Sequence, residues 1–463
     1  MELPFDFCSK MKALLKEEYN DFLSAVALPE PVSIRVNRRK YSAAPPLAPV
    51  AWCGDGYYLD QRPSFTFDPL FHAGAYYVQE ASSMFLAQAV EQLSDKPIKA
   101  LDLCAAPGGK STLLLSSLPA GSLLVANEVI RNRAQILNDN IKKWGYPNAV
   151  VSNNDPSRFS QLPAYFDFIL ADVPCSGEGM FRKDSNAIAE WSADNVSLCA
   201  ARQQRIIKEV WTALKPGGLL VYSTCTYNTK ENEENIDWIC RELGAESVEL
   251  TVNKEWNIGG ALTGNRHCYR FFPHRVKGEG FFLSVLKKNG ETSVPVEEKQ
   301  VAKPKTGKER GKPIPSFPYR DWLEHTPHFA FDISEQEVIA YPEELREDML
   351  FLTKTLKPIS AGLQVATLKG REWAPAHALA LSSDFARGAF PAVELSLKEV
   401  IGYLKKETVQ LPDNLPAGYV LITYKDVPVG WVKNIGHRSN NLYPQEYRIR
   451  TTYTPAELTP ALP

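Results

Sequence analysis

The sequence has no CxxC pair, although it contains eight cysteines in 463 residues. Cysteines scattered in this way indicate neither a zinc site nor a disulfide framework, so we expect no metal and a reducing compartment. No apolar run approaches the ~20 residues that a membrane-spanning helix needs, and the first residues are too charged for a signal peptide. We therefore expect a cytoplasmic monomer with no membrane partner.

An excess of charge of one sign is also missing. The 52 Lys and Arg residues nearly balance the 54 Asp and Glu residues, which leaves a formal net charge of −2. This balance excludes a uniformly basic nucleic-acid binder, so any contact with a polyanion must use local basic patches. Internal repeats are absent as well. With 44% hydrophobic residues, a chain of this length is typical of roughly three globular domains.

Residues 1–92 are predicted to form an N-terminal α+β extension. Apolar side chains between Met11 and Val26 recur at helical spacing and predict one amphipathic helix over residues 1–28. A strand-like alternation at residues 33–37 runs into three consecutive cations, Arg38-Arg39-Lys40. These cations form either a solvated edge or a phosphate contact.

Residues 93–288 alternate between strand-like and helix-like segments. This rhythm predicts an α/β fold with a doubly wound, Rossmann-like parallel sheet. The expected strands are residues 98–103, 123–126, 149–151, 166–170, 218–222 and 281–286, the last of which should close the sheet. The expected helices are residues 111–117, 131–144 and 194–214, with a turn at 215–218.

Residues 289–315 are rich in Lys, Glu, Pro, Gly and Thr, a composition that indicates a linker. Its basic half, from Lys303 to Lys312, is either simply solvated or follows a phosphate backbone. Residues 316–463 are rich in aromatic side chains and in short strand-like pieces such as 418–424 and 430–432. They predict a compact α+β module with a core of its own.

Reactive side chains follow two of the predicted strands. Asp172 and Cys175 come after the strand at 166–170, and Cys225 comes after the strand at 218–222. Open α/β sheets bind ligands beyond the carboxyl ends of their strands. Two thiols and an acid at this edge indicate attack on an electrophilic ring, whereas a pair of inert buried cysteines is the alternative.

The first strand-to-helix turn, Cys104 to Lys110, is built of small residues that let a ligand approach the backbone. A dinucleotide GxGxxG pattern is absent, and a P-loop requires glycine where Cys104 stands. S-adenosylmethionine requires only free N–H groups and room. Glu128 then suits the ribose hydroxyls and Asp155 the adenine amine, although either acid alone is typical of a helix cap.

Three segments carry a resemblance to a known family: CAAPGGKS from Cys104, DVPCSGEGMFRK from Asp172 and YSTCTYNTKENEENI from Tyr222. They resemble the Nop/Sun family of RNA cytosine-C5 methyltransferases. SIRVN, YYVQEASSM and the segment from Arg270 to Leu283 fit as well. The resemblance covers roughly residues 30–290 and is closest to the ribosomal RNA enzymes of RsmF type, which carry a PUA-like RNA-binding domain after the core.

The resemblance implies methylation of C5 of a cytidine in small-subunit ribosomal RNA, with S-adenosylmethionine as methyl donor. It implies that Cys225 is the nucleophile, which adds to C6, and that Cys175 assists release. Asp172 would interact with the N3 edge of the base. The implied cofactor site comprises Cys104, Ala105, Ala106, Pro107, Gly108, Gly109, Lys110, Glu128, Asp155 and Asp172.

Such chemistry requires a base that is out of the stack, so single-stranded or flipped RNA is the expected substrate. The aromatic and basic run Arg266 to Arg270 is a candidate for holding this base. Three alternatives stay open: a transfer RNA cytosine-C5 methyltransferase, a DNA cytosine-C5 methyltransferase, and an assembly factor that binds ribosomal RNA without methylating it.

Overall fold

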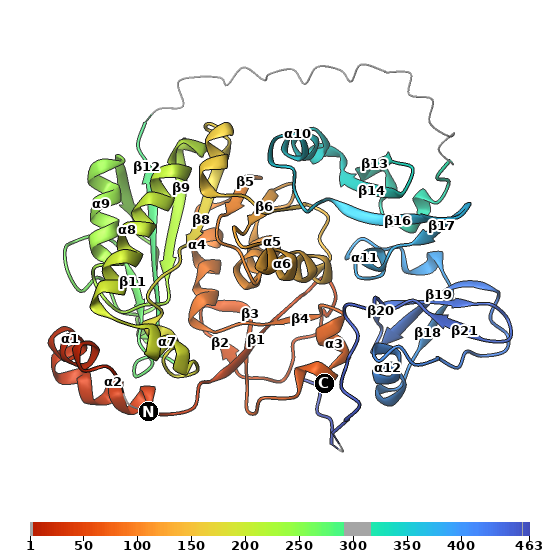
Figure 1. Cartoon of the computed structure of the whole chain (residues 1–463), viewed down its shortest axis with the longest axis horizontal. Helices are drawn as coiled ribbons and strands as arrows, with labels where there is room; N and C mark the ends of the chain where they lie inside the picture. The colour runs from red at the N-terminus through yellow and green to blue at the C-terminus, as the bar shows by residue number, and fades with distance from the viewer. Residues whose placement is uncertain (1–2, 291–315, 456) are drawn as a thin grey trace.

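The computed structural model describes residues 3–290, 316–455 and 457–463 (Figure 1). Most of the predicted linker, including its basic half, therefore lies outside the described residues. Among the described helices, none is long and apolar enough to cross a membrane.

The centre of the molecule is a nine-stranded sheet with the order β10-β12-β9-β8-β5-β6-β7-β15, in which β11 pairs with β12. Its parallel strands are β5 (Lys99–Asp102), β6 (Leu123–Asn127), β7 (Ala149–Ser152), β8 (Phe166–Asp172) and β9 (Leu214–Thr224). The antiparallel strands are β10 (Ala245–Val248), β11 (Tyr269–Phe271), β12 (Phe281–Lys288) and β15 (Ser360–Ala361). This arrangement confirms the predicted doubly wound α/β core.

Helices cover both faces of this sheet: α4 (Leu86–Leu93), α5 (Gly109–Ser117), α6 (Arg131–Trp144), α8 (Ala193–Val210) and α9 (Glu233–Glu242). Two expectations are wrong in detail. The predicted turn at 215–218 lies inside β9, where the pairing with β8 shifts register and accommodates the glycines. The strand at 281–286 does not close the sheet, because β10 pairs with its outer edge.

The N-terminal extension begins with two helices, which are followed by a four-stranded sheet. Its strands are β1 (Val32–Val36), β2 (Pro49–Val50), β3 (Cys53–Leu59) and β4 (Tyr76–Val78). The single helix predicted for residues 1–28 is wrong, since Lys16 adopts a φ of 52° and separates α1 (Phe5–Leu15) from α2 (Tyr19–Val26). Helix α1 packs Phe7 on Phe181 of the loop that follows Cys175, and α2 packs Phe22 on Tyr227 and Phe272.

The three cations after β1 have partners within the protein. Arg38 forms an ion pair with Asp55 at 2.7 Å, and Arg39 lies 3.5 Å from Asp384 of the C-terminal region. Lys40 donates to the carbonyl oxygens of Ala73 and Lys143. The interpretation of this run as a solvated edge is therefore wrong for Arg38 and Lys40, which are bound within the protein, whereas Arg39 is exposed.

The region after residue 316 contains two further four-stranded sheets. One is formed by β13 (Phe329–Ile333), β14 (Glu337–Pro342), β16 (Leu363–Lys369) and β17 (Glu372–Pro375). The other is formed by β18 (Ala392–Glu394), β19 (Gly418–Tyr424), β20 (Val427–Asn434) and β21 (Ser439–Asn441), with α12 (Leu397–Leu404) beside it. The two sheets share a core around Trp322, Val365 and Trp431, the last of which lies on β20.

This cluster contains only residues that follow residue 316, as predicted, but the rest of the region shares apolar clusters with other parts of the chain. Helix α10 (Arg346–Leu356) buries Met349, Leu352 and Leu356 in the same cluster as Val125 and Val150 of the central sheet. β15 extends that sheet by pairing with β7. The β18–β21 sheet in turn shares a cluster with the strands of the N-terminal extension.

The position of α10 has a clear reason in the topology. β7 is followed only by a 3-10 turn, Pro156–Gln161, where a doubly wound fold would place a covering helix. Figure 1 shows α10 close to β5 and β6, and an ion pair of 2.6 Å joins its Asp348 to Lys99 of β5. A helix from beyond the linker therefore completes one helical layer of the central sheet.

Candidate active site

The two predicted thiols meet at the carboxyl edge of the central sheet. β8 ends at Asp172 and β9 ends at Thr224, and the two strands are parallel neighbours with Asp172 opposite Ser223. Cys175 and Cys225 follow these ends as free, partly buried thiols whose sulfur atoms lie 3.2 Å apart. The expectation that the two thiols lie together at this edge of the sheet is confirmed.

The environment of Cys175 holds its proton. Its hydrogen bond with Cys225, together with burial, raises the pKa of the Cys175 thiol well above its ordinary value. A thiol that keeps its proton is a poor nucleophile but a competent hydrogen-bond donor.

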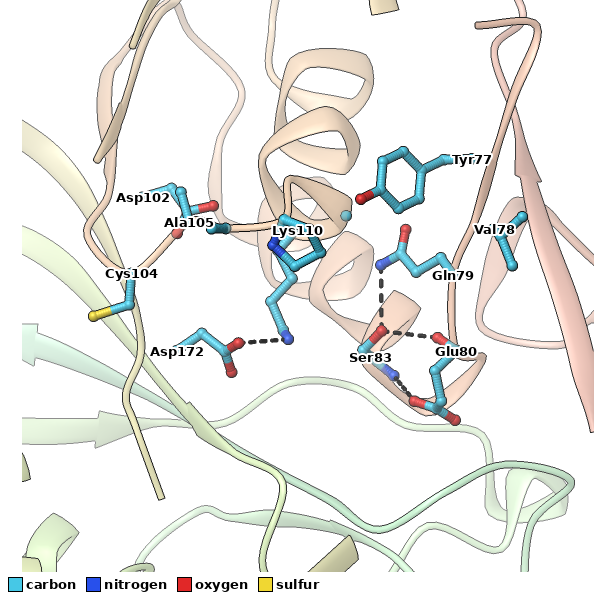
Figure 2. Close-up of a pocket in the computed structure, with 13 residues that line it drawn as sticks. Tyr77, Val78, Gln79, Glu80, Ser83, Asp102, Cys104, Ala105, Lys110 and Asp172 are labelled. Carbon is cyan, nitrogen blue, oxygen red and sulfur yellow. Dashed lines mark hydrogen bonds and ion pairs between the residues drawn. The ribbon is translucent and has the colours of Figure 1, made fainter. Parts of the chain in front are cut away.

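Asp172 is held beside them by two contacts. Its carboxylate lies 2.8 Å from the ammonium group of Lys110 and accepts a hydrogen bond of 2.7 Å from Ser223. Burial lowers the pKa of Lys110, but the Asp172 carboxylate outweighs it and the pKa is raised, so Lys110 stays charged. Figure 2 shows Lys110 reaching across the pocket from the start of α5 to Asp172.

This pocket has two walls that come from distant parts of the chain. One is the turn at residues 104–110, and the other is the segment around β4 of the extension, where Gln79 donates to Ser83, as Figure 2 shows. The lining residues are Tyr77, Val78, Gln79, Glu80, Ser83, Asp102, Cys104, Ala105, Ala106, Pro107, Gly109, Lys110 and Asp172. Sequence reasoning missed the second wall as a site, although its segment YYVQEASSM carried part of the family resemblance.

The turn offers backbone donors and one unpaired acceptor. Gly108, whose φ is 116°, precedes α5 in a left-handed conformation that favours glycine. No side chain caps this end of the helix, so the first backbone N–H groups of α5 are free to bind a ligand. Asp102 at the end of β5 is fully buried, and its Oδ2 accepts from Ser111 while its Oδ1 has no partner. Burial raises the pKa of Asp102 to about 7.

The two acids proposed for ribose and adenine lie outside the lining of this pocket. Glu128 directly follows β6 and is buried, where it accepts from the N–H of Ile130 at 3.0 Å and lies 3.4 Å from Arg133. Asp155 follows β7 and is exposed, and its carboxylate accepts from Ser157 at the start of a 3-10 helix. Each carboxylate thus accepts a hydrogen bond from the backbone two residues further along the chain, as a capping residue does.

The run from Arg266 to Arg270 does not form an exposed platform. Its last residues belong to β11, where Arg270 is 1% exposed, pairs with Glu233 and donates to the carbonyl of Tyr227 at 2.7 Å. Tyr269 is buried in the core between β11 and the extension. The prediction that these two side chains hold a flipped base is wrong, because both are buried within the protein.

Comparison with known proteins agrees with this architecture. Three family models match: the N-terminal domain of 16S rRNA methyltransferase RsmF at residues 3–81, 16S rRNA methyltransferase RsmB/F at 90–287, and the methyltransferase RsmF PUA domain at 390–449. Among solved structures, a methyltransferase homolog protein from Pyrococcus horikoshii has a TM-score of 0.52 at 28% identity, covering 61% of this chain and 94% of its own. NSun6 from the same organism has a TM-score of 0.53 at 21% identity, covering 62% of this chain and 99% of its own.

Curated relatives match almost the whole chain. Ribosomal RNA small subunit methyltransferase F of Erwinia tasmaniensis is 31% identical over 96% of this chain and 96% of its own length. The protein of the same name from Pectobacterium atrosepticum is 32% identical over 96% and 95%. With the Rossmann-like core, the N-terminal extension and the PUA-matching segment in the same order, this chain belongs to the RsmF family of RNA methyltransferases.

Proposed function

We propose that the protein transfers a methyl group from S-adenosylmethionine to C5 of a cytidine in small-subunit ribosomal RNA, through a covalent adduct between Cys225 and C6. The observation that carries the proposal is the pair of free thiols 3.2 Å apart at the ends of adjacent parallel strands. Asp172 and Lys110 lie beside them as a partly buried charged pair. This set of groups is what an addition–elimination at a pyrimidine ring requires.

The residues divide the chemistry as follows. The Cys225 thiolate adds to C6 of the cytosine, which makes C5 nucleophilic, while Asp172 interacts with the N3 edge as charge develops in the ring. After C5 has been methylated, loss of the C5 proton to a base breaks the bond between C6 and sulfur. Cys175 then stabilises the departing Cys225 thiolate, because its S–H lies 3.2 Å away and its raised pKa keeps it protonated.

The pocket beside this centre fits the cofactor. S-adenosylmethionine carries a cationic amino group and a sulfonium, and the unpartnered Oδ1 of buried Asp102 is an acceptor for such a cation. The free N–H groups at the start of α5 suit its carboxylate. When bound there, the cofactor supplies an electrophilic methyl group. Ribosomal RNA is the proposed partner, and the cytoplasm, where that RNA resides, stays the expected location.

A methyl-transfer assay tests this function. The purified protein should transfer tritium from labelled S-adenosylmethionine to small-subunit ribosomal RNA, and digestion should recover the label as 5-methylcytidine. Bisulfite sequencing of RNA from a deletion strain would then identify the cytidine. Label confined to transfer RNA or to DNA would assign another substrate, and RNA binding without transfer would support an assembly factor.

A second prediction concerns Glu128. If its carboxylate holds the ribose, Glu128→Ala should weaken S-adenosylmethionine binding by roughly 2–4 kcal/mol through the loss of two hydrogen bonds to a charged group. Isothermal calorimetry measures this directly, and the melting temperature controls for the loss of the contact with Ile130. Unchanged affinity in a folded variant would remove Glu128 from the cofactor site.

A further inference from the structure

Two buried glutamates link the loops that carry the thiols, because the carboxylate of each one binds the opposite loop. Glu178 lies on the loop that follows Cys175, but its carboxylate binds the segment that follows Cys225. Glu231 lies on the segment after Cys225, but its carboxylate binds the loop around Cys175. The two side chains are 3% and 0% exposed, and we call them the crossed glutamates.

Glu178 holds three consecutive residues after Cys225. Its Oε2 accepts from the hydroxyl of Thr226 at 2.7 Å, from the N–H of Tyr227 at 2.8 Å and from the N–H of Asn228 at 2.9 Å. Its Oε1 accepts from the indole of Trp191 and the amide of Asn228. The backbone immediately after Cys225 is therefore fixed by a carboxylate from the other loop.

Glu231 holds both neighbours of Cys175. Its Oε2 accepts from the N–H of Ser176 at 3.0 Å and from the amide of Gln203 at 2.7 Å, and that amide also donates to the carbonyl of Pro174 at 3.0 Å. Its Oε1 accepts from the hydroxyl of Ser176 and from Asn228. Cys175 thus lies between two residues that are tied to Glu231.

These carboxylates are buried without a positive partner. Within the described part of the chain their bonded donors, five for Glu178 and four for Glu231, are all neutral groups. Burying a carboxylate in this way is costly unless its hydrogen bonds are complete, and apolar side chains would fill the same space more cheaply. The arrangement therefore fixes geometry rather than simply adding stability.

We propose that the crossed glutamates are positioning residues with separate effects on the two halves of the reaction. Glu178 sets the position of Cys225 and so supports addition to C6, whereas Glu231 sets the position of Cys175 and so supports release. This inference rests on the proposed function of the two thiols. It assigns each glutamate to the cysteine of the opposite loop, not to the cysteine nearest in sequence.

Glutamine is the informative replacement because it keeps the shape of the side chain. Each oxygen of both glutamates accepts from at least one N–H group, so the NH2 of a glutamine meets a donor in either orientation. Asp68→Asn is a matched control, since Asp68 is 2% exposed and accepts from Leu70, Tyr76 and Ala461 far from the thiols.

The test follows the covalent RNA band on a denaturing gel in single-turnover reactions with S-adenosylmethionine and ribosomal RNA. Glu178→Gln should slow appearance of the band on the order of tenfold, and Glu231→Gln should slow its disappearance by a similar factor, so that the band accumulates. Affinity for S-adenosylmethionine should stay at the value of the unmodified protein. Asp68→Asn should change neither rate.

Several outcomes would overturn the inference. Equal effects of both glutamine variants on both rates would show a merely structural role, and reversed effects would assign each glutamate to its own loop. If a glutamine variant fails to fold, Thr226→Val and Gln203→Leu each remove one bond to Glu178 or Glu231, together with the other side-chain bonds of Thr226 or Gln203, and the same split is required of them. Cys225→Ala and Cys175→Ala run in parallel separate the two proposals. If these two cysteine variants behave alike, the proposed division of roles between the thiols fails. If they differ as expected but the two glutamine variants affect the same step, only the inference about the crossed glutamates fails.

Discussion

Replacing Cys225 with alanine should reduce methyl transfer to background and abolish the covalent RNA band. The reason is that the alanine side chain has no sulfur to add to C6, and without that addition C5 is not nucleophilic. Binding of S-adenosylmethionine should persist, because Cys225 does not line the pocket beside α5. Transfer of labelled methyl groups and a denaturing gel measure both effects. Cys240→Ala, in α9 and away from the thiol pair, is the control and should retain activity.

Cys175→Ala should behave differently from Cys225→Ala. Addition and methylation can proceed, but the hydrogen-bond donor 3.2 Å from the Cys225 sulfur is lost, so elimination slows and the enzyme accumulates on its RNA. The double variant should show no band. A band with Cys225→Ala and none with Cys175→Ala would exchange the two roles, and the absence of a band in every variant would leave Cys175 without a role in release.

Removing residues 291–463 should strongly destabilise the catalytic core. The truncation withdraws Met349, Leu352 and Leu356 of α10 from the core of the central sheet, and it exposes the edge of β7. Burial of three such side chains contributes roughly 5–9 kcal/mol. That is comparable with the roughly 5–15 kcal/mol that stabilises a whole domain. Thermal unfolding followed by circular dichroism should show a melting temperature far below that of the full chain.

A cleaved full-length chain is the matched control for this truncation. A specific protease site placed within residues 291–315 should yield two fragments that stay associated, since α10, β15 and the cluster shared with the N-terminal extension hold them together. Gel filtration and the melting temperature would test this. A truncated core with the stability of the full chain would contradict the structural role of α10.

The sequence predicted the central strands well because each is a local apolar run that ends in a turn cluster. Helix α6 appears at the predicted residues 131–144 for the same reason, as its apolar spacing and the glycine that ends it are both local. The role of α10 was not predictable in this way, because the β strands that it covers lie some 200 residues earlier. Nor does the pattern of residues 1–28 show the break at Lys16, which only the backbone conformation reveals.

The candidate site shows the same division. Cys175, Cys225 and Asp172 were predicted to lie together because parallel strands end at a common edge. Gln79 and Ser83 were missed because the second pocket wall forms only when the extension packs on the core. Glu178 and Glu231 are typical of exposed loop charges in sequence, and only tertiary packing buries them. The prediction for Arg270 was wrong for the converse reason, because this residue is buried in an ion pair with Glu233 of α9.

The late position of α10 in the chain also matters during synthesis. When residue 290 leaves the ribosome, the apolar face formed by Leu103, Val125 and Val150 still lacks the helix that covers it. At roughly 5–20 residues per second, that helix follows only several seconds later. Each nascent chain therefore passes through an interval in which a nearly complete sheet exposes an apolar surface.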